Sequence, residues 1–344
     1  MQEMTAATMM NFLYELPQQF AHSLELDFSR LGSYRRAYRQ VVVSGLGGSA
    51  IGGDILRVYA RSRARIPIFV NREYEIPAFV NEDTLFVAVS YSGNTEETIS
   101  AYQWARKQGA AIFCITTGGK LAEMADSDGN AVIEIPGGLV PRAATGFLFA
   151  PLALAMEELG VLPALRTEIK ETAAVLEALR EELHPGVEGE QNLARKIAAS
   201  LKGALPIIWG TGGFSEVAAL RWKAQINENA KSPAYYNIFP ELNHNEIVGF
   251  EAPASIISQS AVIILRDHLD HPRVQKRMDI TRSIIEGRVK EIIEVKSRGD
   301  SALARLYSLI YVGDYASTYL ALEYDINPTP VKVIDYLKDE LARE

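Results

Sequence analysis

The sequence Gly45-Leu46-Gly47-Gly48-Ser49 follows the apolar run Val41–Val43, and the longer sequence Ser90-Tyr91-Ser92-Gly93-Asn94-Thr95-Glu96-Glu97-Thr98 follows the apolar run Leu85–Val89. In each case an apolar run, a tight turn and helix-forming residues predict a strand, a loop and the start of a helix. Glycine lets the backbone approach a ligand closely, and a helix N-terminus offers free N–H groups to an anion. Both loops are therefore predicted to hold one phosphate group.

The residues of the two loops also indicate which class of phosphate compound they bind. Neither ends in Gly-Lys-Ser/Thr, so no lysine is placed to reach the outer phosphates of a nucleotide. Gly45–Ala50 does satisfy the dinucleotide pattern G-x-G-x-x-G/A. That pattern usually has an acidic residue at the end of the second strand, whereas Ile66–Val70 runs into Asn71-Arg72 and reaches Glu73 only afterwards. A phosphomonoester is favoured, with a dinucleotide or ordinary turn geometry as the alternatives.

Strand-like and helical segments alternate in two parts of the chain, which predicts an α/β protein with parallel, doubly wound sheets. In the first part we expect strands at 40–44, 66–70, 84–89, 111–115 and 131–135, and helices at 49–63, 94–108 and 120–126. In the second part we expect strands at 205–210, 254–265 and 290–295, and helices at 215–230, 271–287 and 301–324. The predicted domains are an N-terminal domain at 1–155, a helical connection at 156–200, a C-terminal domain at 201–325 and a tail helix at 326–344.

Composition limits the class of protein. A chain of 344 residues, 48% of them hydrophobic, is longer than one core usually serves, so two domains are expected. The net charge of −8 argues against a nucleic-acid or membrane partner, because those require clustered basic surface. The single cysteine, Cys114, cannot form an internal disulfide. With no export signal and no apolar stretch near the roughly 20 residues of a membrane span, a cytoplasmic location is expected.

Five segments resemble the sugar isomerase (SIS) domain proteins, specifically the bifunctional phosphoglucose/phosphomannose isomerases of archaea and bacteria. They are 45–54, 90–98, Pro141-Arg142, 227–231 and 241–246. The resemblance implies two SIS domains, each a flavodoxin-like parallel sheet flanked by helices, and a C-terminal helix. It also implies a homodimer with sites near its interface. The implied activity is interconversion of glucose 6-phosphate, fructose 6-phosphate and mannose 6-phosphate, with no cofactor and no metal.

Such an isomerisation moves a proton between C1 and C2, for which a carboxylate base is the usual choice. Glu228 matches the family's base, although a glutamate near a helix end is more often solvated surface. Glu246 is the next candidate.

Opening the sugar ring needs a second acid–base group, and histidine titrates in a suitable range. His244 resembles the family's ring-opening histidine, which is expected to come from the partner subunit, although a single histidine is more often structural or merely exposed.

A negatively charged enediolate is well stabilised by a guanidinium, which stays protonated. Arg142 matches the family's Pro-Arg, against the alternative of a surface arginine beside a proline. The family also uses a lysine of the terminal helix in ring opening. Lys338 is the predicted lysine, and Lys332 is its competitor.

The two loops supply the predicted binding residues. These are Gly47, Gly48, Ser49, Ser90, Ser92 and Thr95. Gly210–Gly213, in the second part, lacks a following hydroxyl-rich loop, so one site per chain is expected.

Two other functions remain open. A non-catalytic sugar-phosphate sensor would need the loops but no catalytic residues, and an isomerase of another sugar phosphate, such as a pentose 5-phosphate, would share both but usually has a single SIS domain.

Overall fold

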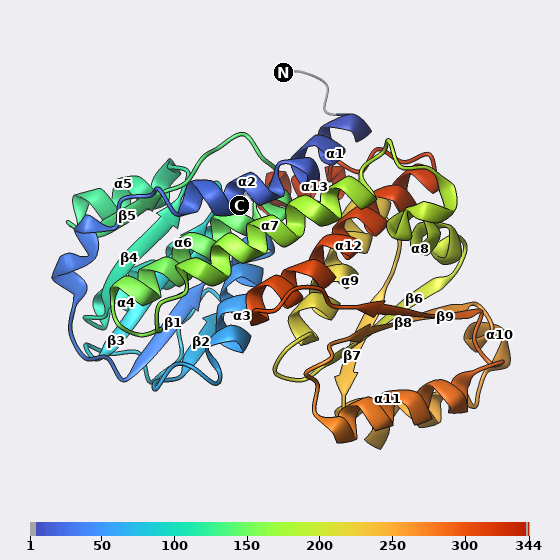
Figure 1. Cartoon of the computed structure of the whole chain (residues 1–344). Helices are drawn as coiled ribbons and strands as arrows, with labels where there is room; N and C mark the ends of the chain where they lie inside the picture. Colours follow the sequence, from blue (N-terminus) through green and yellow to red (C-terminus); the bar gives the residue numbers. More distant parts are fainter. Residues whose placement is uncertain (1–4, 342, 344) are drawn as a thin grey trace. The chain divides into compact units, whose positions relative to one another are not determined.

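The computed structural model describes residues 5–341 and 343, which divide into two compact units (Figure 1). The N-terminal unit contains Glu15–Glu177 and Gly299–Arg305. The C-terminal unit contains Ala178–Arg298, residues 306–341 and 343, and residues 5–14. In the described part of the chain, no helix has the length and apolarity that crossing a membrane requires.

The N-terminal unit is built on a five-stranded parallel sheet with the order β2-β1-β3-β4-β5. Its strands are β1 (Gln40–Ser44), β2 (Ile68–Asn71), β3 (Thr84–Ser90), β4 (Ala111–Thr116) and β5 (Ala131–Glu134). Its main helices are α2 (Leu16–Ser23), α3 (Gly48–Ala60), α4 (Glu96–Lys107), α5 (Gly119–Ser127), α6 (Thr145–Glu158) and the first part of α7 (Arg166–Leu183). This strand order is the flavodoxin-like one, so the predicted doubly wound fold is confirmed, with element ends shifted by a few residues.

Both faces of this sheet are buried. On one face, Val42, Phe86 and Cys114 pack in a core with Tyr102 of α4 and Leu121 of α5. The residues between them point to the opposite face, and β3 is buried over its whole length. Burial on both faces explains why the strands read as continuous apolar runs rather than as alternating patterns.

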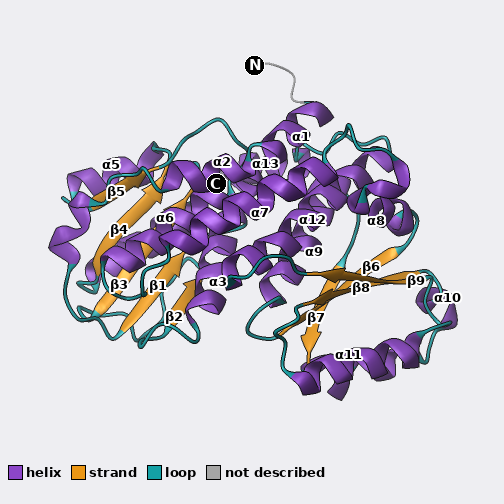
Figure 2. Ribbon diagram, viewed as in Figure 1, coloured by secondary structure: helices purple, strands orange, loops and turns teal. Residues whose placement is uncertain are grey.

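The C-terminal unit has a four-stranded parallel sheet with the order β7-β6-β8-β9 (Figure 2). Its strands are β6 (Leu205–Thr211), β7 (Tyr235–Phe239), β8 (Ser260–Arg266) and β9 (Glu291–Lys296). Its helices include α1 (Ala6–Tyr14), α8 (Leu193–Leu201), α9 (Glu216–Ala230), α11 (Pro272–Ile285), α12 (Ala302–Glu323), which starts in the other unit, and α13 (Lys332–Leu341). This sheet repeats the first four positions of the N-terminal sheet.

Two elements of the second part differ from the predictions. The expected strand at 254–265 is wrong at its start, because Ala254–Ile257 forms the short helix α10 and β8 begins only at Ser260. The strand β7 was not predicted. It is an edge strand with Tyr235 59% exposed, so its sequence does not read as a buried apolar run.

Candidate active site

The two predicted phosphate loops leave neighbouring strands at the same edge of the N-terminal sheet. β1 pairs with β2 on one side and with β3 on the other, and all three strands run parallel. The strand order therefore reverses between β1 and β3. In open α/β sheets, ligands bind at the carboxyl ends of the strands beside such a reversal.

Hydrogen bonds join these loops to one another. The backbone N–H of Tyr91 donates to Ser49 Oγ at 3.2 Å, which connects the second loop to the first. Within the second loop, Ser90 Oγ and Thr95 Oγ1 lie 2.9 Å apart, and the Gly93 N–H donates to Ser90 Oγ. Ser92 differs from its neighbours because its side chain is exposed at the turn. Ser90 and Thr95, directly before α4, and Ser49, at the start of α3, are thus joined in one cluster through the backbone of Tyr91.

The backbone at Pro141-Arg142 packs against the first glycine-rich loop. Arg142 lies in the short 3-10 helix Pro141–Ala143 and is only 4% exposed. A Cβ atom at Gly48 would lie 2.6 Å from the carbonyl oxygen of Pro141 and 3.2 Å from the N atom of Arg142. Only glycine allows this approach, and Gly47 before it has a positive φ of 52°. The structure therefore brings the predicted residues Gly47, Gly48, Ser49 and Arg142 together.

Glu228 lies in the last turn of α9 and is half-buried. The helix is fixed to α12 by a fully buried ion pair, in which Arg221 Nη2 lies 2.8 Å from Asp314 Oδ2. Nearer to Glu228, the Asn229 side chain donates to Ser317 Oγ at 3.0 Å. Burial raises the pKa of Asp314, and the Arg221 guanidinium opposes that rise. These contacts hold the helix end that carries Glu228 in one place.

His244 is presented at the surface by a hydrogen-bonded turn. It ends the 3-10 helix Glu241–His244, and its side chain is exposed. The two flanking asparagines are used to hold the turn. Asn243 Nδ2 donates to Thr281 Oγ1 at 2.8 Å, and Asn245 Nδ2 donates to Glu241 Oε1 at 2.8 Å. The sequence Asn-His-Asn therefore combines two structural side chains with one that faces outward.

The alternative base, Glu246, has a structural role in this turn. Its Oε1 atom accepts a hydrogen bond of 2.8 Å from the indole N–H of the buried Trp209, and its Oε2 atom accepts one from Asn237. Both carboxylate oxygens are thus engaged in holding the turn against the sheet. This arrangement favours Glu228 over Glu246 as the base.

Within one chain, Glu228 and His244 lie at opposite ends of β7. Glu228 is at the end of α9, from which the chain turns into β7, and His244 follows shortly after β7 ends. The five residues of β7 span about 16 Å at roughly 3.3 Å per residue. One strand length therefore separates the end of α9, which carries Glu228, from the turn that carries His244.

The two candidate lysines lie on α13, whose lead-in is tied to α9. Lys231, just after α9, donates from Nζ to the carbonyl oxygen of Pro328 at 3.1 Å. Lys332 is the first residue of α13, and Lys338 lies in its last turn. Both side chains are exposed. The two lysines are six residues apart and so lie on different faces of α13. Since both are exposed, burial does not distinguish them as candidates.

In the second glycine-rich loop, Gly210–Gly213, two backbone N–H groups are already hydrogen-bonded to side chains of the same chain. Thr211 N donates to Ser215 Oγ at 2.8 Å, and Gly213 N donates to Glu216 Oε2 at 2.7 Å. The Glu216 carboxylate thus occupies an N–H group that a phosphate would otherwise bind.

We therefore expect one phosphate ligand per chain. Replacing Thr95 by valine removes a hydroxyl that can bind the phosphate and should weaken binding of a hexitol 6-phosphate about 10-fold or more in calorimetry. The matched change Thr211→Val, in the second loop, should leave both the affinity and the stoichiometry of one per chain unaltered. A loss of affinity in the Thr211 variant, or two sites per chain, would contradict this assignment.

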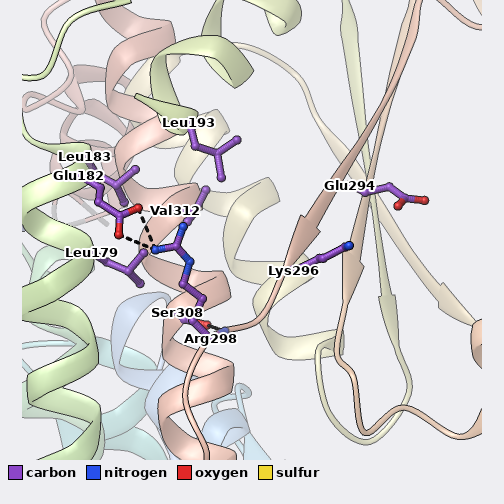
Figure 3. Close-up of a pocket in the computed structure, with 9 residues that line it drawn as sticks. All are labelled: Leu179, Glu182, Leu183, Leu193, Glu294, Lys296, Arg298, Ser308 and Val312. Carbon is purple, nitrogen blue, oxygen red and sulfur yellow. Dashed lines mark hydrogen bonds and ion pairs between the residues drawn. The ribbon is translucent and has the colours of Figure 1, made fainter. Parts of the chain in front are cut away.

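A cavity of about 340 Å³ in the C-terminal unit is lined by apolar and charged side chains, unlike the hydroxyl-rich loops of the N-terminal unit (Figure 3). It is lined by Leu179, Glu182, Leu183, Leu193, Glu294, Lys296, Arg298, Ser308 and Val312. Arg298 Nη1 is paired with both carboxylate oxygens of Glu182, at 2.6 and 2.8 Å, and Glu294 is paired with Arg266. The charges balance, and no predicted site residue lines the cavity. It therefore does not have the character of a site for a phosphate dianion.

The fold and the loops define the class of protein, a tandem SIS-domain protein. Residues 35–135 match the SIS domain family, and residues 190–341 match the bacterial phospho-glucose isomerase C-terminal SIS domain. A solved structure, the C-terminal domain of glucosamine-fructose-6-phosphate aminotransferase from Francisella tularensis, has the same fold. It superimposes with a TM-score of 0.71 over 94% of this chain and 97% of its own, at 14% identity.

The family follows from full-length relatives. A bifunctional phosphoglucose/phosphomannose isomerase of Caldicellulosiruptor bescii is 50% identical over 97% of this chain and 99% of its own. One from Aquifex aeolicus is 37% identical over 89% of this chain and 91% of its own. The chain belongs to the family of bifunctional phosphoglucose/phosphomannose isomerases. The resemblance noted in the sequence is thereby confirmed.

Proposed function

We propose that the protein is an aldose–ketose isomerase that interconverts glucose 6-phosphate with fructose 6-phosphate, and mannose 6-phosphate with fructose 6-phosphate. The observation that carries this proposal is the hydroxyl cluster of Ser49, Ser90 and Thr95 at one sheet edge, with the loop of the buried Arg142 packed against Gly48, in a chain 50% identical to a bifunctional isomerase. A sensor would need the hydroxyl groups alone. A buried arginine on the loop that packs against Gly48 adds a fixed positive charge, which suits the stabilisation of an enediolate at the other end of the substrate from the phosphate.

In the proposed reaction, the two loops and the N-terminus of α4 hold the substrate phosphate. His244 transfers a proton between the anomeric hydroxyl and the ring oxygen, which opens the ring, and a lysine of α13 assists. Glu228 removes the C2 proton of the aldose and returns it to C1, while the hydroxyl proton of O2 passes to O1. Arg142 stabilises the negative charge on the intermediate enediolate. The enediolate has lost its configuration at C2, so glucose and mannose 6-phosphate share this intermediate.

We also propose that the active protein is a homodimer in the cytoplasm, with His244 acting on the substrate held by its partner. The separation of Glu228 and His244 by the length of β7 supports this arrangement. So does the terminal helix α13, whose side chains Val333, Tyr336 and Leu337 are apolar and exposed, Val333 to 82%. The buried free thiol of Cys114 fits a reducing location.

The test is an assay of the purified, chelator-treated protein with fructose 6-phosphate, in which glucose 6-phosphate and mannose 6-phosphate are measured separately. Formation of both products is expected. Glucose 6-phosphate alone would reject the mannose activity. No product from a protein that still binds a hexitol 6-phosphate would favour a sensor or an isomerase of another sugar phosphate.

A further inference from the structure

Tyr91 is buried inside the phosphate loop, between Ser90 and Ser92, with 5% of its surface exposed. Its phenolic oxygen makes two hydrogen bonds to one other loop. It donates to the carbonyl oxygen of Pro136 at 3.0 Å and accepts from the Leu139 N–H at 3.0 Å. Burial raises the pKa of Tyr91, so the phenol keeps the proton that it donates to Pro136.

The segment between these two contacts is Gly137-Gly138. Both glycines are exposed, and Gly138 has a positive φ of 94°. A glycine pair has no side chain that could pack and restrict it. The two hydrogen bonds of Tyr91 therefore lie on either side of Gly137-Gly138, where the backbone of the loop before Pro141-Arg142 has the greatest conformational freedom.

The backbone of Tyr91 is itself fixed by two further loops. Its N–H donates to Ser49 Oγ at 3.2 Å. Its carbonyl oxygen accepts from the N–H of Thr117 at 3.1 Å and from the Thr117 hydroxyl at 2.8 Å. The backbone of Tyr91 is thus fixed relative to the predicted phosphate-binding hydroxyls. Its side chain in turn fixes the loop that carries Arg142 relative to them.

We propose that Tyr91 is a positioning residue, which sets the distance between the phosphate-binding loops and Arg142. This inference rests on the proposed function, because it requires Arg142 to stabilise the enediolate. The phosphate is carried on C6 and the enediolate forms at C1 and C2, so both ends of one substrate must be held at once. A displacement of about 1 Å at such a group lowers the rate by roughly 100-fold. Tyr91 touches no reacting atom and acts through Arg142.

The test is the variant Tyr91→Phe, with turnover expressed per site titrated by a hexitol 6-phosphate. We expect kcat to fall about 10- to 100-fold while KM and the affinity for the hexitol phosphate change less than about 3-fold. The matched control is Tyr102→Phe. Tyr102 is a buried tyrosine of the same unit whose hydroxyl also makes two hydrogen bonds, donating to Asp128 Oδ2 at 2.8 Å and accepting from Asn130 Nδ2 at 2.8 Å. That control should lower the unfolding temperature and leave kcat unchanged.

Arg142→Lys separates a failure of this inference from a failure of the proposed function. If Tyr91 acts through Arg142, the double variant should be no slower than Arg142→Lys alone, since the two effects share one cause. Additive losses would overturn the inference, as would a wild-type kcat for Tyr91→Phe or an equal loss of kcat in Tyr102→Phe. A wild-type kcat for Arg142→Lys together with a slow Tyr91→Phe would instead overturn the role assigned to Arg142 in the proposed function.

Discussion

Replacing Glu228 by glutamine is expected to lower kcat for both isomerisations by about 1,000-fold or more, because the C2 proton loses its acceptor. Glutamine has nearly the same size, and α9 remains fixed by its contacts to α12. Binding of a hexitol 6-phosphate should therefore be retained. Exchange of the C2 proton of glucose 6-phosphate with solvent deuterium, followed by NMR, should fall in parallel with turnover.

The matched control for Glu228→Gln is Glu246→Gln. Glu246 is bound through both carboxylate oxygens to Trp209 and Asn237, so its loss should lower the unfolding temperature. Its kcat should remain within a few-fold of the wild type. Retained turnover and exchange in Glu228→Gln would exclude Glu228 as the base. A selective loss of both in Glu246→Gln would assign the role to Glu246 instead.

A heterodimer of one Glu228→Gln chain and one His244→Ala chain is expected to keep about half of the wild-type activity, although each homodimer is nearly inactive. The reason is the position of the two residues at opposite ends of β7 in one chain. If each site combines Glu228 of one chain with His244 of the other, this heterodimer contains one intact site. Two affinity tags allow it to be purified after co-expression and assayed.

The complementary heterodimer pairs a wild-type chain with a chain that carries both substitutions. With shared sites it should be inactive, because each of its sites contains one altered residue. With sites built from a single chain the result is reversed. The doubly substituted heterodimer would then keep about half of the activity, and the first heterodimer would be inactive. That reversed pattern would contradict the shared site, and a chain that stays monomeric in solution would contradict the dimer itself.

Much of the fold is predictable because its signals are local. Each strand of the N-terminal sheet is an apolar run of a few residues, and the turns after β1 and β3 are marked by glycines. Both features act over neighbouring residues, so they can be recognised without knowledge of the rest of the chain. The position of the hydroxyl-rich loops at the ligand edge follows in the same way, since parallel strands place their carboxyl ends together.

The elements that escaped prediction are those whose burial depends on distant parts of the chain. β7 pairs with the sheet on one side only, and its exposed tyrosines give no buried-strand pattern. The residues before β8 are apolar and resemble a strand, but they form α10. In both cases a local pattern fits more than one structure, and tertiary contacts decide between them.

The sequence by itself determined the family and the doubly wound sheets, and it supplied the predicted phosphate-loop residues and the candidate base, histidine and arginine. Only the tertiary structure showed that Ser49 is bonded to the Tyr91 backbone, that Tyr91 holds the loop of Arg142, and that Glu246 serves the turn around His244. It alone placed Glu228 and His244 at opposite ends of a strand. These relations join residues far apart along the chain, and their distances are set by how the strands pair and the helices pack, which no local pattern specifies.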